Sequence, residues 1–207
     1  MTLTLYFAPG SSSMAPHIAL HEVGAPFEPR PVSFWGKANR SAEYLALNPE
    51  GKVPTLLIDG RPLTEVAAIL FYLARSFPAA GLLPAGAEAE AHVVSWMSFA
   101  ASTLHPARRR GLEHAISVWR IADQRLGQRE WLVGDRYSIA DIHVFRLYWR
   151  MIGSLKPEPG TFRNLARHHE RIMVRPAVVR TIADETAVGY ELTAPPTEAL
   201  SSPRAKP

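Results

Sequence analysis

The chain contains no cysteine among its 207 residues. This absence excludes disulfide bonds, thiolate metal ligands and a cysteine nucleophile carried by the protein itself. It also fits a reducing compartment, so we expect a cytoplasmic protein. No run of about 18 apolar residues is present, which predicts that the chain does not span a membrane. The first residues lack the charged and then apolar pattern of a signal peptide.

Long runs of one charge are also missing, and the net charge is a mild +4. The single basic cluster, residues 108–110 (Arg-Arg-Arg), is typical of a solvated helix end or loop. No zinc-finger, RRM or basic-zipper spacing accompanies it, so we expect no nucleic-acid partner. The composition, 47% hydrophobic and 20% charged, is that of a globular protein with a sizeable core.

The first 78 residues alternate between strand and helix patterns. Leu3, Leu5 and Phe7 recur with period two and predict a strand over residues 2–7, after which a helical period runs to Gly24. The same reasoning predicts strands near 27–33, 53–58 and 61–64 and helices over 41–47 and 66–77. This β-α-β-α-β-β-α order favours one mixed sheet covered by helices.

The remainder of the chain has helical periodicity and no convincing strand. Residues 78–86 are rich in Pro, Gly and Ala and predict a linker. We therefore expect an α/β domain over 1–78, an all-helical domain over 87–193 and a loose Pro- and Ser-rich tail over 194–207. Ser138 and Asp141 form a capping-box pattern, which predicts a helix start without a catalytic role.

Several segments together resemble a glutathione transferase, most closely the bacterial beta class. They are LYFAPGSSSMAPHIALHEVG, LALNPEGKVPTLLIDGRPLTEVAAILFYL, WLVGDRYSIADIHVF and RIMVRPAVVRTIADE, which span about residues 5 to 187. The resemblance implies a thioredoxin-like N-terminal domain with a mixed four-stranded sheet, a C-terminal helical bundle and a homodimer. It also implies transfer of glutathione, the co-substrate, to a small hydrophobic electrophile. Two alternatives remain: a non-catalytic protein that binds glutathione or a hydrophobic ligand, and a glutathione-dependent isomerase or dehalogenase.

Five residues match the glutathione-binding positions of the family. Val53-Pro54 resembles the family's cis-proline turn, in which Val53 would pair its backbone with the cysteinyl part of the peptide. The resemblance implies that Glu65 receives the γ-glutamyl ammonium and that the Val66 N–H meets its carboxylate. Many relatives carry serine where this chain has Val66, so we expect weaker binding there. Lys37 corresponds to a lysine that pairs with the glycine carboxylate.

The thiol-activating group is less settled, because four hydroxyls are candidates. The beta-class cysteine corresponds to Ser12, whereas classes that use serine place it at Ser11. Ser13 matches the serine after the beta-class cysteine, and Tyr6 lies near the catalytic tyrosine of other classes. Alignment to the beta pattern ranks Ser12 first. One of the three serines is also expected to be the N-cap of the following helix.

His105 follows the same leucine as the active-site histidine of beta-class relatives. Ser98, Ser102 and His105 are spaced i, i+4 and i+7, which predicts one helix face overlooking the thiol. Pro106 departs from the family pattern, and we expect it to hold His105 outside helical backbone angles.

No functional role is predicted for two other groups. His17 and His21 are one helical turn apart, but no third ligand is evident, so no metal site is expected. The large aromatic residues of the helical half are expected in the core rather than in a substrate pocket: Trp96, Phe99, Trp119 and Trp149.

Overall fold

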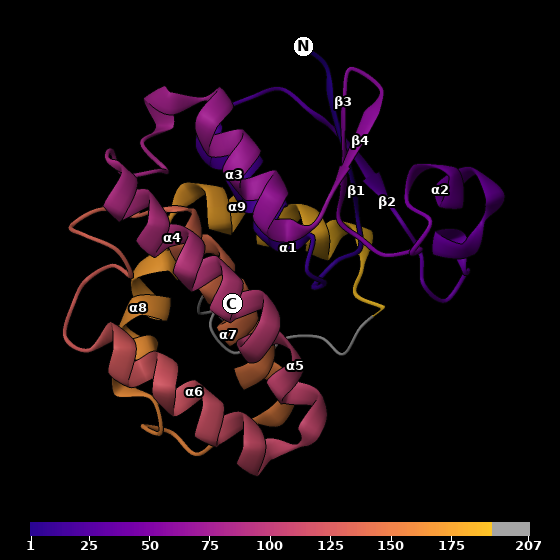
Figure 1. Ribbon diagram of the computed structural model, residues 1–207. Coiled ribbons are helices and arrows are strands. Elements are labelled where there is room, and N and C mark those ends of the chain that lie inside the picture. Colours follow the sequence, from indigo (N-terminus) through magenta and orange to yellow (C-terminus); the bar gives the residue numbers. More distant parts are fainter. Residues whose placement is uncertain (192–207) are drawn as a thin grey trace, which may run out of the picture.

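A four-stranded sheet and a group of helices make up the computed structural model, which describes residues 1–191 (Figure 1). The predicted tail over 194–207 lies outside the described residues. The strands are β1 (Leu3–Phe7), β2 (Glu28–Pro31), β3 (Thr55–Ile58) and β4 (Arg61–Thr64). The helices between them are α1 (Met14–Val23), the short η1 (Ala38–Arg40) and α2 (Ala42–Leu47). The expected β-α-β-α-β-β-α order is completed by α3 (Val66–Ser76).

The sheet is mixed, as the sequence predicts. Its strand order is β2-β1-β3-β4, with β1 parallel to β2 and antiparallel to β3, and β3 antiparallel to β4. Asp59 and Gly60 both have positive φ (48° and 80°), the backbone that the tight β3–β4 hairpin requires.

Alternation along β1 directs its side chains to two different layers. Leu5 is opposite Leu56 of β3, and both are fully buried. Phe7 shares this face with Leu5 and contacts His17 of α1, with ring centroids 4.9 Å apart. The other face carries Tyr6, whose ring lies 5.6 Å from that of Tyr44 in α2. Helix α1 therefore covers one face, and α2 lies against the other.

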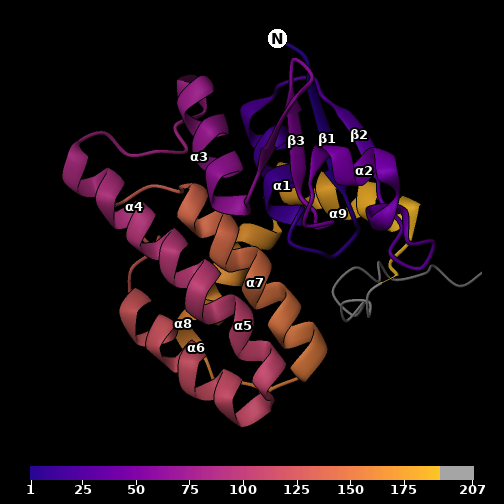
Figure 2. The same ribbon diagram turned by 45° about the vertical axis from the view of Figure 1, so that its right-hand side comes forward.

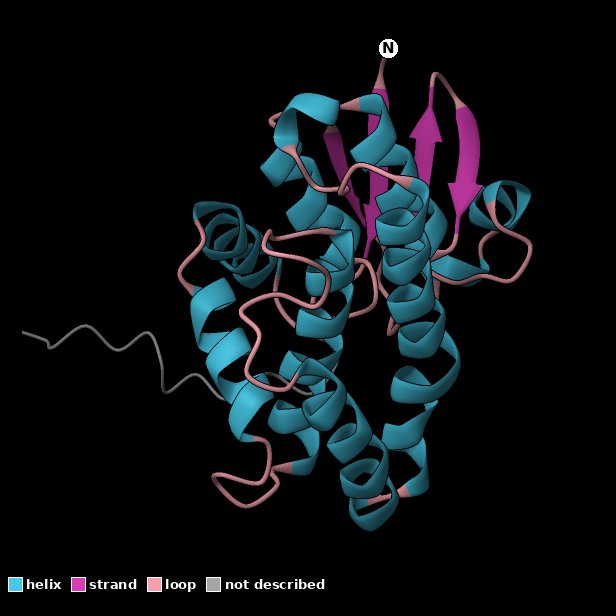
Figure 3. Cartoon of the chain, turned by 60° about the vertical axis from the view of Figure 1, so that its left-hand side comes forward, coloured by secondary structure: helices cyan, strands magenta, loops and turns pink. Residues whose placement is uncertain are grey.

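The second half is entirely helical within the described residues. After the turn η2 (Pro78–Ala80), its elements are α4 (Ala87–Phe99), η3 (Ala100–Leu104), α5 (His105–Ala107), η4 (Arg108–Arg110), α6 (Leu112–Leu126), α7 (Ile139–Leu155), α8 (Arg163–Met173) and α9 (Pro176–Val188). Figure 3 shows the magenta strands at one end of the molecule and helices throughout the rest. A thioredoxin-like domain is thus followed by a helical domain, as expected.

Helices α7 and α9 join the two halves. Helix α7 contacts α1 and α3 of the first half as well as α4 and α8 of its own, and nearly all of its residues are buried. Helix α9 returns along α1 beneath the sheet (Figure 2). One continuous hydrophobic core consequently runs through both halves. No helix of the described residues is long and apolar enough to cross a membrane.

The start of α7 confirms the predicted capping box. Asp141 Oδ2 accepts hydrogen bonds from the backbone N–H and the hydroxyl of Ser138, each at 2.8 Å. Its Oδ1 accepts from Leu132 N (2.9 Å) and is bonded to His168 Nε2 (2.8 Å). Four hydrogen bonds therefore satisfy this fully buried carboxylate, which ties the α6–α7 loop and α8 to the helix start.

Candidate active site

The three serines form the turn between β1 and α1, and two of them serve the turn itself. Ser13 Oγ accepts from Ala8 N (3.0 Å), donates to Ala8 O (3.2 Å) and lies 2.7 Å from Ser11 Oγ. Because Ser13 uses its only proton on Ala8 O, the proton between the two serines comes from Ser11. Ser11 Oγ in turn accepts from Ser13 N (3.2 Å). The hydroxyls of Ser11 and Ser13 are therefore engaged within the turn.

Ser12 differs from both neighbours. It is half-buried and lines a cavity of about 540 Å³, and no hydrogen bond joins its hydroxyl to another described residue. Ser13 occupies the N-cap position of α1, but its hydroxyl bonds back to Ala8 instead of capping the helix. The prediction of an N-cap serine is therefore correct for the position of Ser13 but wrong for its hydrogen bond, because its hydroxyl does not cap the helix. Of the three serines, only Ser12 has a hydroxyl without a hydrogen bond to another described residue.

Two buried charged residues hold this turn from the helical half. Arg146 of α7 donates from Nε to Ser11 O (2.8 Å) and from Nη2 to Gly10 O (3.1 Å). Glu185 of α9 accepts from Gly10 N at 2.7 Å. Burial, followed by the charge of Arg150, lowers the pKa of Arg146 to about 9. Sequence reasoning missed both residues, although a charged residue within an otherwise apolar helix face signals a buried partner.

A cis peptide bond joins Val53 to Pro54, which confirms the predicted turn. Both residues line the same cavity as Ser12. No described residue is bonded to the backbone N–H or C=O of Val53. Backbone groups of this kind seek partners, and an extended peptide can pair with them as an added strand.

Glu65 and Val66 form the next part of the cavity wall. Glu65 has φ 69° and ψ 125°, a conformation that costs a non-glycine residue of order 1–3 kcal/mol. This backbone turns the chain from β4 into α3, so that the Val66 N–H begins a helix and has no intrahelical partner. A carboxylate suits such an N-terminus because the helix dipole favours negative charge there.

His105 lines the cavity from the helical half, but its backbone differs from expectation. It has φ −60° and ψ −50°, so the prediction that Pro106 holds it outside the helical region is wrong. The reason is the π-helical turn η3, in which His105 N bonds to Ala100 O, five residues back. A π turn is wider than an α turn. It therefore makes room for the proline ring of Pro106, which has no N–H to donate and crowds the preceding turn.

The π turn also overturns the prediction that Ser98, Ser102 and His105 share one helix face. Because such a turn holds more residues than an α turn, positions beyond it rotate relative to α-helical spacing. Ser98 and Ser102 are exposed, Ser102 Oγ donates to Ser98 O at 2.8 Å, and neither lines the cavity with His105. Burial first, and then Arg146 and Arg109, lower the pKa of His105 to about 4, so its ring is neutral at pH 7.

The cavity that these residues surround has a volume of about 540 Å³. From the predicted set it brings together Ser11, Ser12, Val53, Pro54, Glu65, Val66 and His105. Sequence reasoning did not find its other polar lining residues: Asn39, Arg40, Asn48, Glu50, Lys52, Thr64 and Arg109. They are scattered over two short helices, the end of a strand and loops, and so they carry no periodic signal. A volume of this size suits a small-molecule ligand.

Three other predicted residues lie away from this cavity: Lys37, Ser13 and Tyr6. Lys37 is exposed and is not among its lining residues, where Arg40, Lys52 and Arg109 supply the positive charge. Ser13 is fully buried in the turn.

Tyr6 belongs to the opposite face of the sheet. Arg30 Nη1 donates to its hydroxyl at 3.4 Å, and its ring meets Tyr44. This hydroxyl therefore leaves the set of thiol-activating candidates. As expected, Trp96, Trp119 and Trp149 are buried in the core and Phe99 packs against it, and none of the four lines the cavity.

The two domains and the cavity wall are together those of a thioredoxin-like protein with a cis-proline turn. The family model "Glutathione S-transferase, N-terminal domain" matches residues 1–75, and "Glutathione S-transferase, C-terminal domain" matches residues 104–176. The chain is 31% identical to glutathione S-transferase GstA of Escherichia coli O157:H7 over 203 residues, which cover 88% of this chain and 98% of that protein. The chain belongs to the glutathione S-transferase family.

Solved structures give the same result. A sphingomonad glutathione S-transferase complexed with glutathione is 33% identical, with a TM-score of 0.78 over 88% of this chain and 98% of the other. The bacterial beta class glutathione S-transferase of Sphingomonas chungbukensis is 32% identical, with a TM-score of 0.77 and the same coverage of both chains.

Proposed function

We propose that this protein is a glutathione transferase that joins the glutathione thiolate to a small electrophile. One observation carries the proposal: a single cavity collects the free Ser12 hydroxyl, the unpaired Val53 backbone and the strained Glu65–Val66 helix start. These groups match the parts of an extended peptide that has a thiol and an α-amino acid end.

The ends of the peptide find complementary charges along the cavity. Its α-ammonium suits the Glu65 carboxylate, and the adjacent carboxylate suits the Val66 N–H. At the other end, the glycine carboxylate suits Arg40 or Lys52, both of which line the cavity where the sequence had pointed to Lys37. Val53 pairs with the cysteinyl unit between them.

Ser12 then stabilises the thiolate. A free thiol has a pKa near 8.5, so half-ionisation at pH 7 needs about 1.5 pKa units, roughly 2 kcal/mol. One hydrogen bond to a charged group contributes about 1.5–3 kcal/mol, and the N-terminus of α1 adds to it. The thiol proton leaves to solvent, sulfur forms the new bond to the electrophile, and the leaving group departs with its electron pair. No protein-bound intermediate is required.

The electrophile is proposed to approach from the helical half. Ala101, His105, Pro106 and Arg109 line that side of the cavity. Apolar contacts from Ala101 and Pro106 suit a small hydrophobic body, and neutral His105 can exchange hydrogen bonds with its polar group. We further propose that the protein is a cytoplasmic homodimer, and sedimentation velocity of the purified chain tests the dimer.

Glutathione titration with thiolate absorbance as the signal tests this proposal. Wild type is expected to bind glutathione and to show thiolate at pH 7, whereas Ser12→Ala raises the thiol pKa by about 1–2 units while binding is retained. Ser13→Ala is the matched control, because its hydroxyl is engaged with Ala8 and the turn.

The outcomes separate the rival functions. Binding without a thiolate signal in wild type would support a non-catalytic binding protein. An unchanged thiol pKa in Ser12→Ala would remove Ser12 from the mechanism. Absence of binding at millimolar glutathione would overturn the glutathione proposal altogether.

A further inference from the structure

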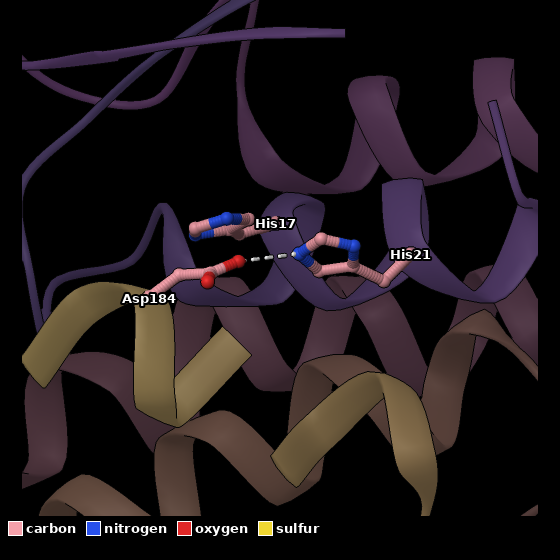
Figure 4. A group of neighbouring side chains, drawn as sticks. All are labelled: His17, His21 and Asp184. Atoms are coloured by element: carbon pink, nitrogen blue, oxygen red, sulfur yellow. Dashed lines mark hydrogen bonds and ion pairs between the residues drawn. The ribbon is translucent and has the colours of Figure 1, made fainter. Parts of the chain in front are cut away.

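Outside the cavity, helices α1 and α9 bring three metal-ligating side chains together (Figure 4). His17 and His21 are one turn apart on α1, and Asp184 comes from α9, which lies along α1. The expectation that the histidine pair lacks a third ligand is therefore wrong. Asp184 is 163 residues beyond His21, so no local sequence pattern reveals it.

The spacing of the ligand atoms suits a small cation. One ligand atom from each residue lies within 4.8 Å of the other two. His21 Nε2 and Asp184 Oδ2 are 3.2 Å apart. Zinc bonds of about 2.0–2.2 Å in a tetrahedron place neighbouring ligand atoms about 3.3 Å apart. This pair already has that separation as a hydrogen bond, in which His21 Nε2 donates to the carboxylate, so a bound cation takes the place of that proton. The third ligand needs a modest inward shift.

Glu185 orients His17 for such a role. Its Oε1 lies 3.2 Å from His17 Nδ1, and both side chains are almost fully buried. An ionised carboxylate only accepts hydrogen bonds, so the proton is on Nδ1 and the Nε2 lone pair is left for a ligand. A carboxylate behind a ligating histidine is the usual support in metal sites, because it fixes the tautomer and the ring orientation.

An aromatic side chain lies against both histidines. Phe27 meets both histidine rings edge-on, at 5.6 Å from His17 and 5.3 Å from His21, and gives the pair an apolar wall.

A cation can reach this cluster from solvent. The Asp184 side chain is 48% exposed, and it leaves room for water as a further ligand. Arg180 is the competing positive charge, with its Nε 3.8 Å from Asp184 Oδ2. Its side chain is 72% exposed, so it can turn away at little cost.

We propose that His17, His21 and Asp184 bind a divalent first-row transition cation of the zinc type, with Glu185 positioning His17. Two imidazoles and one carboxylate form the donor set of many three-residue zinc sites that keep a position for water. Glu185 also accepts from Gly10 N, so the same carboxylate supports the proposed ligand and the turn that carries Ser12.

The test uses the full chain without a histidine tag. Zn²⁺ binding is measured by calorimetry, and Co²⁺ absorption reports a site with nitrogen and oxygen ligands. We expect one Zn²⁺ per chain in wild type and a loss of at least about tenfold in affinity in His21→Gln and Asp184→Asn. The matched control is His92→Gln, because His92 is an exposed histidine with a carboxylate one turn away on α4.

Thermal unfolding completes the test, because a ligand that binds only the folded state raises its stability. Zn²⁺ should raise the Tm of wild type and His92→Gln but not that of His21→Gln or Asp184→Asn. Equal Zn²⁺ affinity in wild type and in the two cluster variants would overturn the proposal, as would the absence of stoichiometric binding in wild type. Metal-free unfolding curves show that each variant is folded, so a loss of binding is not mistaken for a loss of structure.

Discussion

Replacing Arg146 with methionine tests how the serine turn is held. The guanidinium makes two hydrogen bonds to carbonyl oxygens of the turn, at 2.8 Å to Ser11 O and 3.1 Å to Gly10 O. Arg146 is only 5% exposed, so water does not readily replace these bonds. Methionine is unbranched and fits a buried position, but it ends where the arginine Nε lies and leaves both carbonyls without this donor.

The expected loss follows from opposing contributions. Hydrogen bonds to a charged group contribute about 1.5–3 kcal/mol each, so the two bonds are worth about 3–6 kcal/mol. Burying the guanidinium costs part of this, as the lowered pKa of Arg146 shows, and methionine removes that cost. Glu185, which raises the pKa of Arg146 through its charge, loses a nearby positive charge in the variant. We expect the free energy of unfolding to fall by about 2–4 kcal/mol.

Urea unfolding measures this difference, with Arg120→Met as the matched control. Arg120 is an exposed residue of α6, so the same chemical change there should shift stability by about 0.5 kcal/mol or less. Hydrogen exchange of the Gly10 amide gives a second readout, because the loosened turn should exchange faster in Arg146→Met. A loss no larger than that of Arg120→Met would refute the reasoning, since it would mean that the two hydrogen bonds contribute no net stability.

Two further predictions concern the cavity and the helical core. Val66→Ser should supply a hydroxyl at the start of α3 and lower the Kd for glutathione about 2–10-fold. Calorimetry measures the Kd, with Val66→Ala as the control because alanine adds no hydrogen-bond donor. Equal Kd values in the two variants would contradict the prediction. His143 is buried, and burial, followed by the charges of Arg146 and His105, lowers its pKa from 6.5 to about 3. Unfolding therefore takes up a proton between these pH values, so the contribution of His143 is present above pH 6.5 and is lost as the pH falls towards 3. His143→Leu should flatten the fall of stability between pH 7 and 5 by up to about 1.4 kcal/mol per pH unit, and parallel profiles in urea unfolding would show the prediction wrong.

Local patterns predicted the sheet well because each element carries its own signal. Period-two alternation in β1, the Asp59-Gly60 hairpin and the helical period of α3 are encoded within a few residues. The capping box at Ser138 is equally local, and the structure confirms it. The failures around His105 show the limit of such patterns. Pro106 was expected to hold His105 outside helical angles, and Ser98 and Ser102 were placed beside His105 by α-helical spacing, whereas the segment before Pro106 is a π turn.

Contacts between residues far apart in the chain could not be predicted from the sequence. Arg146 and Glu185 reach the serine turn from 135 and 175 residues away, and Asp184 meets His21 across a similar gap. Such pairs become visible only when α7 and α9 are placed against α1. Resemblance could rank Ser12 first among its neighbours, but it could not show that the other two hydroxyls are occupied.

The serine turn now has separate structural and chemical parts. The hydroxyls of Ser11 and Ser13 bond to each other, and the Ser13 hydroxyl and the Ser11 N–H bond to Ala8, so they hold the turn against β1. Arg146 and Glu185 fix the same turn from the helical domain through its backbone. Because the hydroxyls of both neighbours are engaged, the Ser12 hydroxyl is free to face the cavity. Under the proposed function the three adjacent hydroxyls therefore divide between two tasks: two serines hold the turn, and the third is the one proposed to meet the thiol.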